Sequence, residues 1–215
     1  MDFLIENYVV GPVGTNCYFL INKETKQAIV FDPGAAADAL YGKLKEGGYE
    51  LKSILLTHGH FDHADGVADL KTLANEDGLD VSVYAYEAEK ETLENPRMNL
   101  SGAMNYKEAV YHADVFLKDE QVIEIAGFSI RVLFTPGHTP GGCCYYLADE
   151  GICFTGDSLF CSSIGRTDFP GGSMSDLVRS VKEKVLTLPE DTVCYPGHDT
   201  VTSVGDEKRY NPFLA

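Results

Sequence analysis

The segment LTHGHFDHADG, residues 56–66, constrains this chain more than any other. It places His58, His60, Asp62 and His63 within six consecutive positions. The chain has six histidines, so half of them lie in this one segment. Imidazole and carboxylate groups spaced this closely are typical of a metal site rather than of an ordinary polar loop. The segment also follows the apolar run SILLT and precedes a helical pattern, a junction where a rigid scaffold often positions functional groups.

Three later segments repeat the same local arrangement, an apolar run followed by a glycine-containing turn. They are LFTPGHT with His138, ICFTGDS with Asp157 and VCYPGHD with His198. The candidate ligands are therefore His58, His60, Asp62, His63, His138, Asp157 and His198. His112 lies outside this pattern, and we interpret it as an ordinary loop histidine.

The composition of this set predicts the kind of metal site. Neutral imidazole and carboxylate suit zinc, iron or manganese, whereas calcium prefers oxygen ligands alone. Seven ligands are too many for one tetrahedral ion, but they suit two ions if one carboxylate bridges them. A closed structural zinc site uses four ligands, often cysteines, and no cysteine here has suitable spacing. We therefore expect an open, catalytic centre with two divalent ions, zinc preferred and iron or manganese compatible.

Charge and cysteine usage narrow the function classes. The net charge of -16, from 33 acidic and 17 basic residues, argues against a nucleic-acid or anionic-membrane partner. The start MDFLIENYVV has no basic region typical of a signal peptide, and no apolar run approaches membrane-spanning length. The six cysteines form no C-x-x-C pair and are interpreted as reduced structural residues. We expect a cytoplasmic protein with a single domain over residues 1–215.

The order of the expected elements indicates an α/β protein. Apolar runs predict strands, and helical spacing predicts helices that end at Gly47-Gly48 and at Asn95-Pro96. The expected strands lie at 3–10, 17–22, 27–32, 53–57, 81–85, 114–117, 121–127, 128–138, 142–157 with a hairpin at 148–151, and 192–198. The expected helices lie at 35–48, 66–78, 87–94 and 173–189. Residues 97–113 lack clear periodicity and form a loop or a lid, in which Met104, Tyr106 and Tyr111 either line a substrate wall or cover the core.

The order of these motifs resembles the metallo-β-lactamase superfamily. The match runs from VFDPG to EKRYNPF and includes H-x-H-x-D-H, P-G-H, G-D and G-H in the family order. The resemblance implies an αββα four-layer sandwich, two mixed β-sheets flanked by helices, with the metals at one edge. It also implies a first metal held by His58, His60 and His138. The second would be held by Asp62, His63 and His198, with Asp157 bridging the two.

Within the superfamily, GDSLFCSSIGRTDFPGG resembles glyoxalase II, a hydrolase of hydroxyacyl-glutathione thioesters. The chain is most similar to the compact, single-domain bacterial glyoxalase II-like type. True β-lactamases of this fold typically place a cysteine at the position of Asp157 or lack a bridging carboxylate there. The resemblance implies that Arg166 contacts the glutathione carboxylate; the alternative is a structural arginine paired with Asp168.

The resemblance implies a metal-dependent hydrolase of a small-molecule thioester such as S-(hydroxyacyl)glutathione, acting through a metal-bound hydroxide. Asp62 is the candidate catalytic residue that orients the nucleophile and takes its proton. Asp32, in VFDPG, is a candidate partner that fixes a ligand histidine, or else a turn residue before Pro33. One alternative is a mononuclear-iron persulfide dioxygenase, a family with a similar G-R-T-D-F segment and iron at positions matching His58, His138 and Asp157. Another is a metal-binding scaffold without catalysis.

Overall fold

The computed structural model describes residues 2–105 and 107–215. Within this part of the chain, the strands form two six-stranded mixed sheets and a small hairpin. The first sheet has the order β1 (Phe3–Val10), β2 (Thr15–Asn22), β3 (Gln27–Phe31), β4 (Glu50–Leu55), β5 (Ser82–Tyr86) and β6 (Val115–Leu117). The second has the order β14 (Thr202–Ser203), β13 (Val193–Pro196), β10 (Ile152–Gly156), β9 (Cys143–Leu147), β8 (Phe128–Phe134) and β7 (Val122–Ile125). The hairpin pairs β11 (Leu159–Phe160) with β12 (Ser163–Ile164).

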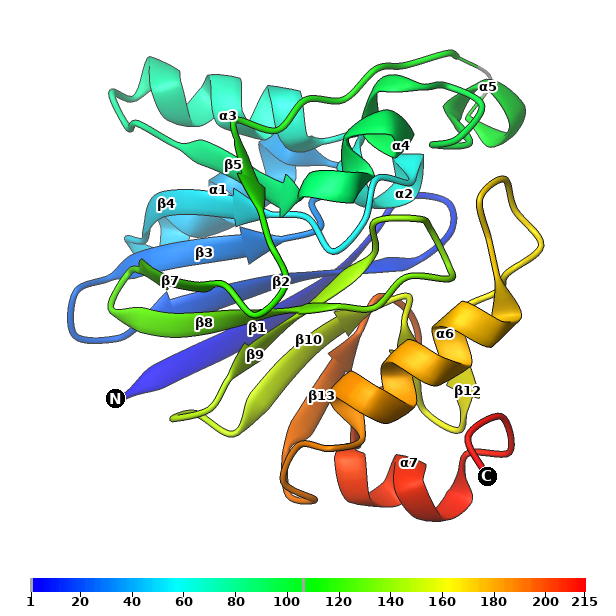
Figure 1. Ribbon diagram of the computed structural model, residues 1–215. Coiled ribbons are helices and arrows are strands. Elements are labelled where there is room, and N and C mark those ends of the chain that lie inside the picture. The colour runs from blue at the N-terminus through cyan, green and yellow to red at the C-terminus, as the bar shows by residue number, and fades with distance from the viewer. Residues whose placement is uncertain (1, 106) are drawn as a thin grey trace.

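Helices cover the outer face of each sheet (Figure 1). Those associated with the first sheet are α1 (Ala37–Gly47), α2 (Phe61–Ala64), α3 (Val67–Glu76), the 3₁₀ turn η1 (Glu87–Glu89), α4 (Lys90–Glu94) and α5 (Ser101–Met104). Those associated with the second are α6 (Met174–Ser180), the π-helical turn η2 (Val181–Val185) and α7 (Val204–Tyr210). The predicted four-layer α/β arrangement is therefore confirmed. Among the described helices, none has the length and apolar character needed to cross a bilayer.

Strand β2 shows how the layers are held together, because both of its faces are buried. Cys17, Phe19 and Ile21 pack with the helices on the outside of the first sheet. Tyr18 and Leu20 point the other way, into the apolar layer between the two sheets. This alternation follows from the two-residue period of a strand. It explains why CYFLIN reads as a continuous apolar run rather than as an alternating one.

Most predicted boundaries agree with the structure. Helix α1 ends at Gly48, which adopts a left-handed conformation with φ of 66° and donates its N–H to Leu44 and Lys45. Helix α4 is followed by Asn95, as predicted. Strand β14 and helix α7 were not predicted, although Ser203 caps α7 by accepting a hydrogen bond from the Asp206 N–H, a recognisable start signal.

Candidate metal centre

The seven candidate ligands follow the carboxyl ends of four strands at one edge of the two sheets. His58 and His60 lie in the turn after β4, and His138, Asp157 and His198 follow β8, β10 and β13. Strand β10 is parallel to β13, and both β8 and β10 are antiparallel to β9, so β8, β10 and β13 run the same way. Their carboxyl ends therefore meet at one edge, which is where open α/β sheets usually bind ligands.

The H-x-H-x-D-H segment is not a plain loop. His60 precedes the short helix α2, and Asp62 and His63 lie within it, so the helix turns both side chains toward the same edge. Glycine is required at Gly197, because a β-carbon there would collide with Asp157 Oδ1. The turn after β13 can thus approach the end of β10 closely enough to bring His198 to the centre.

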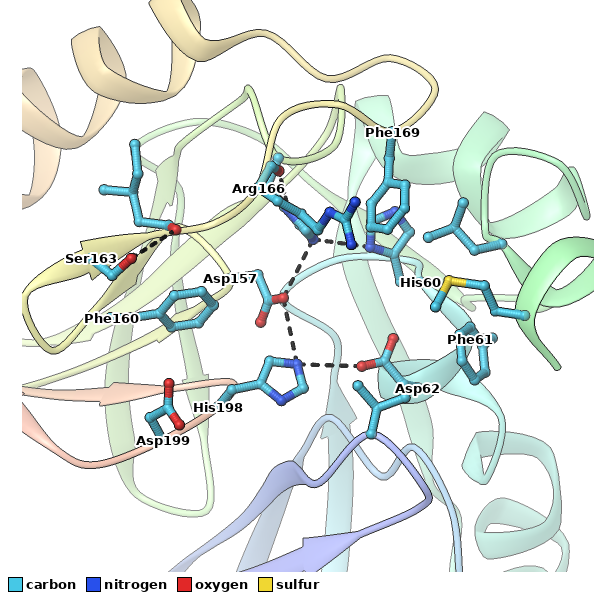
Figure 2. A pocket seen from close by; sticks show the side chains of 15 residues that line it. His60, Phe61, Asp62, Asp157, Phe160, Ser163, Arg166, Phe169, His198 and Asp199 are labelled. Carbon is cyan, nitrogen blue, oxygen red and sulfur yellow. Dashed lines mark hydrogen bonds and ion pairs between the residues drawn. The ribbon is translucent and has the colours of Figure 1, made fainter. Parts of the chain in front are cut away.

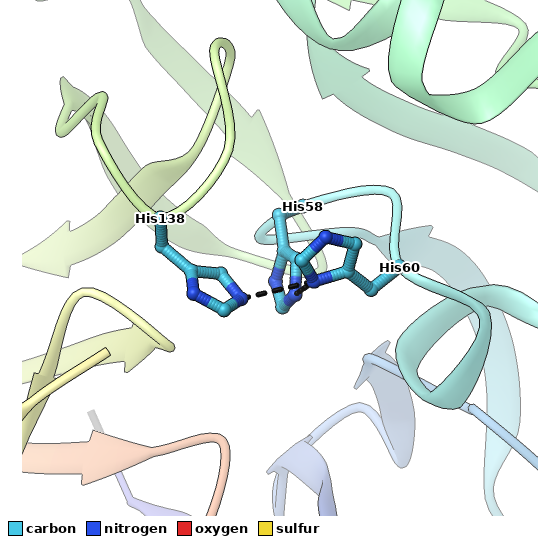
Figure 3. A group of neighbouring side chains, drawn as sticks. All are labelled: His58, His60 and His138. Atoms are coloured by element: carbon cyan, nitrogen blue, oxygen red, sulfur yellow. Dashed lines mark hydrogen bonds between the residues drawn. The ribbon is translucent and has the colours of Figure 1, made fainter. Parts of the chain in front are cut away.

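His58, His60 and His138 form what we call the three-histidine group (Figure 3). Nδ1 of His60 lies 3.1 Å from Nε2 of His58 and 2.9 Å from Nε2 of His138. Nδ1 of His138 donates a hydrogen bond of 2.7 Å to the Arg166 carbonyl, which leaves the lone pair of Nε2 facing His60. Three imidazole nitrogens thus converge on one point from two distant loops.

Asp62, His63 and His198 form a second cluster, the mixed group. Nε2 of His198 lies 3.3 Å from Asp62 Oδ2, and Nε2 of His63 lies 3.6 Å from the same oxygen. Asp157 stands between the two groups (Figure 2). Its Oδ2 is 3.4 Å from His138 Nε2 and 3.5 Å from His198 Nε2, and its Oδ1 is 3.3 Å from His63 Nε2.

The chemistry of these donors fits two cations. Burial lowers the pKa of His58 and His138 and brings that of His60 to about 3, so all three rings are neutral at pH 7 with lone pairs available. Burial alone would also lower the pKa of His63, but the carboxylates of the site raise it overall. Converging neutral imidazoles cannot all satisfy one another by hydrogen bonds, because each carries a single N–H. A positive ion satisfies them all.

Asp32 lies directly behind the centre and is 2% exposed. Its Oδ2 is 3.0 Å from Nδ1 of His63. Its two oxygens also accept hydrogen bonds from the N–H and the hydroxyl of Thr57, at 2.8 and 2.7 Å. The Thr57 oxygen is in turn 3.2 Å from Nδ1 of His58. The structure thus brings Asp32 to one candidate ligand directly and to another through Thr57, as its interpretation as a partner of a ligand histidine requires.

A pocket of about 400 Å³ opens onto both groups. This volume is within the usual range for small-molecule sites. Its candidate ligands are His60, Asp62, His138, Asp157 and His198, and its apolar wall consists of Val13, Phe61, Leu100, Met104, Phe160, Ile164 and Phe169. Figure 2 shows both rings beside the polar groups: the Phe169 ring is 5.7 Å from the His60 ring and the Phe160 ring is 6.0 Å from the His198 ring, measured between centroids. The arrangement can hold an apolar acyl group against the wall while its polar end faces the candidate ligands.

Arg166 lies at the rim of the pocket and makes contacts compatible with both interpretations. Its guanidinium donates two hydrogen bonds to Asp168, of 2.8 and 2.7 Å, and lies 3.9 Å from the centre of the Phe169 ring. The side chain remains 56% exposed, so it can also reach a ligand. Its charge is already paired with Asp168, so any substrate carboxylate would have to share the guanidinium with that residue.

Residues 97–105 and 107–113 are anchored to helix α2 through Asn99. The carbonyl of Asn99 accepts the Phe61 N–H, and its side chain donates to the carbonyls of Leu93 and Ala109. Met104 lines the pocket, whereas Tyr111 is buried and donates its hydroxyl to Asp65 at 3.0 Å. Tyr106 lies outside the described residues.

The remaining sequence predictions concern residues away from the centre. His112 has a 74% exposed side chain and approaches Glu94 at 4.0 Å, as expected for an ordinary loop histidine. Five cysteines are buried, as structural residues are, and Cys161 is exposed. Two residues that contact the centre were not predicted from the sequence. Thr15 donates its hydroxyl to Asp62 Oδ2 at 2.9 Å, and Glu89 contacts both loops of the three-histidine group. Neither residue belongs to a motif that marks it.

Comparisons with known proteins agree with this geometry. The family model described as "Metallo-beta-lactamase superfamily" matches residues 10–198. The "Probable metallo-hydrolase YqgX" of Bacillus subtilis (strain 168) is 39% identical over 206 residues, covering 95% of this chain and 94% of that protein. The "Hydroxyacylglutathione hydrolase GloC" of Haemophilus influenzae is 35% identical over 212 residues, covering 98% of this chain and 97% of that protein.

Two solved structures are also similar over nearly the whole chain. The structure described as BLEG-1 B3 metallo-beta-lactamase has a TM-score of 0.91 and 38% identity, covering 98% of this chain and 99% of that one. The structure of TTHA1623 in a di-iron-bound form has a TM-score of 0.81 and 32% identity, covering 97% of this chain and 100% of that one.

Proposed function

The chain belongs to the metallo-β-lactamase superfamily of metal-dependent hydrolases, and we propose that it hydrolyses a small-molecule thioester with the help of two divalent ions. The observation that carries this proposal is the position of Asp157 between two complete ligand groups that open onto one pocket. A similar protein over nearly its full length is named as a hydroxyacylglutathione hydrolase, and another was solved with two irons. We propose zinc as the preferred metal and S-(hydroxyacyl)glutathione as the first substrate to test.

In this proposal each group of side chains has a separate task. His58, His60 and His138 would hold one ion, the mixed group would hold the other, and Asp157, which lies between the two groups, would contribute to both sites. Two divalent ions held there would lower the pKa of a shared water and polarise the carbonyl oxygen of the substrate.

The remaining tasks fall to the side chains around the ions. Asp62 takes the proton of the attacking water, and the Thr15 hydroxyl, 2.9 Å from Oδ2, fixes the orientation of that carboxylate. Asp32 keeps His63 oriented through the contact at Nδ1. Phe160, Phe169 and Leu100 exclude water from the acyl group.

Arg166 is proposed to bind a carboxylate of the thiol carrier. Among the described residues that line the pocket, it is the one Lys or Arg, and the guanidinium N–H groups that Asp168 does not use remain available to a carboxylate. The ligands come from both sheets, which supports our proposal that residues 1–215 act as one domain.

The test combines metal analysis with turnover. Protein expressed without metal supplement is measured for metal-to-protein stoichiometry by mass spectrometry and then assayed with S-lactoylglutathione and a chromogenic β-lactam. The expected result is about two ions per chain, thioester hydrolysis that a chelator abolishes, and no turnover of the β-lactam. A single iron together with oxygen uptake on glutathione persulfide would replace the hydrolase with a dioxygenase. Metal binding without any turnover would indicate a scaffold.

A further inference from the structure

Glu89 is a fully buried carboxylate that the proposed chemistry does not use. It lies at the end of η1, directly after β5 and next to α4, on the side of the first sheet that carries α2 (Figure 1). Its side chain is surrounded by the two loops that carry the three-histidine group. Glu89 is not among the described residues that line the pocket.

The carboxylate of Glu89 is bonded to both loops at once. Oε1 accepts the N–H of Gly59 at 2.8 Å, and Gly59 stands between His58 and His60. Oε2 accepts the N–H of Gly141 at 2.7 Å and the hydroxyl of Thr139 at 3.1 Å, and Thr139 follows His138. One side chain thus joins two loops that are far apart in the sequence and that both carry members of the three-histidine group.

The backbone around Glu89 is built for this close approach. A β-carbon at Gly141 would collide with the backbone nitrogen of Glu89. A β-carbon at Gly59 would lie 3.0 Å from the Leu93 side chain and 3.1 Å from its backbone nitrogen, which is tight contact with α4. Both loops consequently rest on the same η1–α4 segment, and the position of each is set relative to the carboxylate.

The charge of Glu89 is costly in this place. Burial raises the pKa of its carboxyl to about 7, although the hydrogen bonds from the two loops oppose the shift. No Lys, Arg or His forms an ion pair with it among residues 2–105 and 107–215. A buried carboxylate without a counter-charge destabilises a fold, so other side chains would serve better if packing were its only task. Cations held by the neighbouring histidines would supply the missing positive charge.

We propose that Glu89 is a positioning residue that aligns the two histidine loops and sets the affinity of the three-histidine group for its metal ion. This inference rests on the metal assignment of the proposed function, but not on the substrate. By linkage, whatever the ion contributes to stabilising the ionised carboxylate, the carboxylate contributes equally to binding the ion.

The test is the substitution Glu89→Gln, which keeps the size of the side chain. Glutamine must turn an NH₂ donor toward either Gly59 or Gly141, whose N–H groups are donors themselves. We expect one of the two ions to bind about 10- to 100-fold more weakly, the usual cost of losing a partner behind a metal ligand. The readout is zinc titration of metal-free protein against a chromogenic chelator, supported by the absorption spectrum of the cobalt-substituted protein.

Glu207→Gln is the matched control. Glu207 is 2% exposed and likewise accepts a backbone N–H, from Ser162, and a hydroxyl, from Thr202 at 2.6 Å. It belongs to α7 and to neither candidate group. Its substitution is expected to lower the free energy of unfolding and to leave both zinc affinities unchanged. Equal weakening of both ions in Glu89→Gln, or the same weakening in Glu207→Gln, would show a general structural effect and overturn the proposal.

Two backgrounds identify which ion is affected. The variant His198→Ala damages the mixed group, and adding Glu89→Gln to it should still weaken the binding of the remaining ion. The variant His138→Ala damages the three-histidine group, and adding Glu89→Gln to it should leave the affinity for the remaining ion unchanged. A change in that affinity contradicts the proposal. Thr139→Val removes a single donor to the same carboxylate and should cost about fivefold in affinity, which keeps the test usable if Glu89→Gln folds poorly.

The outcome separates this inference from the proposed function. If the wild-type protein binds two ions and Glu89→Gln binds both with affinities within about twofold of the wild-type values, the inference alone is overturned. Wild-type protein that binds one ion contradicts the two-metal function, and the inference is then decided by the ratio of wild-type to variant affinity for that ion. Wild-type protein that binds none contradicts both.

Discussion

Asp157 is the residue whose removal should separate the two ligand groups. Its Oδ2 lies 3.4 Å from Nε2 of His138 and 3.5 Å from Nε2 of His198, and these two histidines belong to different groups. We predict that Asp157→Asn lowers the metal content from two ions per chain to one and reduces thioester turnover by about 100-fold or more, because an amide is a poor metal ligand and cannot bridge. Mass spectrometry of the purified variant measures the first effect.

Asp199→Asn is the control for Asp157→Asn. Asp199 lines the same pocket and has a φ of 62°, which asparagine tolerates. The Asp199→Asn variant should retain two ions per chain. If Asp157→Asn also retained two ions and full turnover, its assignment as the bridging ligand would be wrong.

Glu89 gives a prediction on pH. Burial raises the pKa of its carboxyl from 4.5 to about 7 in the folded protein. Between these values the folded state binds more protons than the unfolded state, so this residue makes the free energy of unfolding fall as the pH rises. The free energy of unfolding of the wild type minus that of Glu89→Gln should therefore fall by up to about 1.4 kcal/mol per pH unit across this window. Above the window this difference should level off.

Urea unfolding of both proteins in chelator at roughly pH 5 to 8 measures this slope, and taking the difference cancels the titration of the histidines common to both. A difference that does not change with pH would mean that Glu89 has an ordinary pKa in the folded state.

At this scale the sequence indicated the candidate ligands and one residue that supports them, Asp32, but it did not indicate Thr15 or Glu89. All seven predicted ligands come together in the structure. They could be recognised in the sequence because they share one local pattern, an apolar run followed by a turn. From the sequence, Glu89 is only one residue of the expected helix 87–94, since its partners are groups on two remote loops. The sequence also could not decide whether Arg166 contacts a ligand or pairs with Asp168. The structure shows that the pair with Asp168 forms while the guanidinium stays accessible.

Among the elements, the turn after β3 and helix α2 depend on each other. Gly34 lies so close to α2 that a β-carbon would collide with the backbone oxygen of Asp62. We predict that Gly34→Ala shifts α2, weakens the ion in the mixed group and lowers the free energy of unfolding by about 1–3 kcal/mol, the usual cost of overpacking. Zinc titration and urea unfolding measure the two effects.

Gly42 is the opposite case. It lies in the middle of α1, and a β-carbon there would meet nothing within 4 Å. Gly42→Ala should raise the free energy of unfolding by about 0.5–1 kcal/mol and leave metal binding unchanged. If Gly34→Ala behaved like Gly42→Ala, the packing of the turn against α2 would not position the mixed group.

Elements were predicted best where a strong periodic pattern had clear end signals. Helices α1 and α4 are examples, with Gly48 and Asn95 at their ends. Helix α2 is not among the helices expected from the sequence, because four residues are too few to show a period. The 97–113 segment has little regular structure, and its order comes from the bonds of Asn99 rather than from periodicity.

For the whole molecule, the strong negative charge should oppose the approach of anionic substrates. The net charge is -16, and Asp199 at the pocket adds to the local field. We predict that kcat/KM for a glutathione thioester, which carries a net negative charge, rises several-fold between low and physiological salt because salt screens the repulsion. A thioester of a neutral thiol should show no such rise. A fall for the glutathione thioester would instead indicate a basic local field around Arg166.

The four-layer architecture was predictable through family resemblance more than through pattern alone. Continuous apolar runs such as CYFLIN indicate strands buried on both faces, but they do not say which strands are neighbours. The pairing of β10 with β13, across the hairpin β11–β12 and helix α6, joins segments about forty residues apart. Such long-range pairing depends on tertiary packing, which leaves no local signal in the sequence.

The distribution of ligands along the chain has a consequence for how the protein matures. The first four candidate ligands lie between His58 and His63, whereas the others arrive with the second sheet, the last of them at His198. During synthesis the early histidines therefore leave the ribosome long before their partners exist. On the proposed metal assignment, neither ion would have its full set of donors until β8, β10 and β13 have docked. A truncated or misassembled chain would therefore lack a complete binding site, and we expect metal uptake to follow the formation of the second sheet.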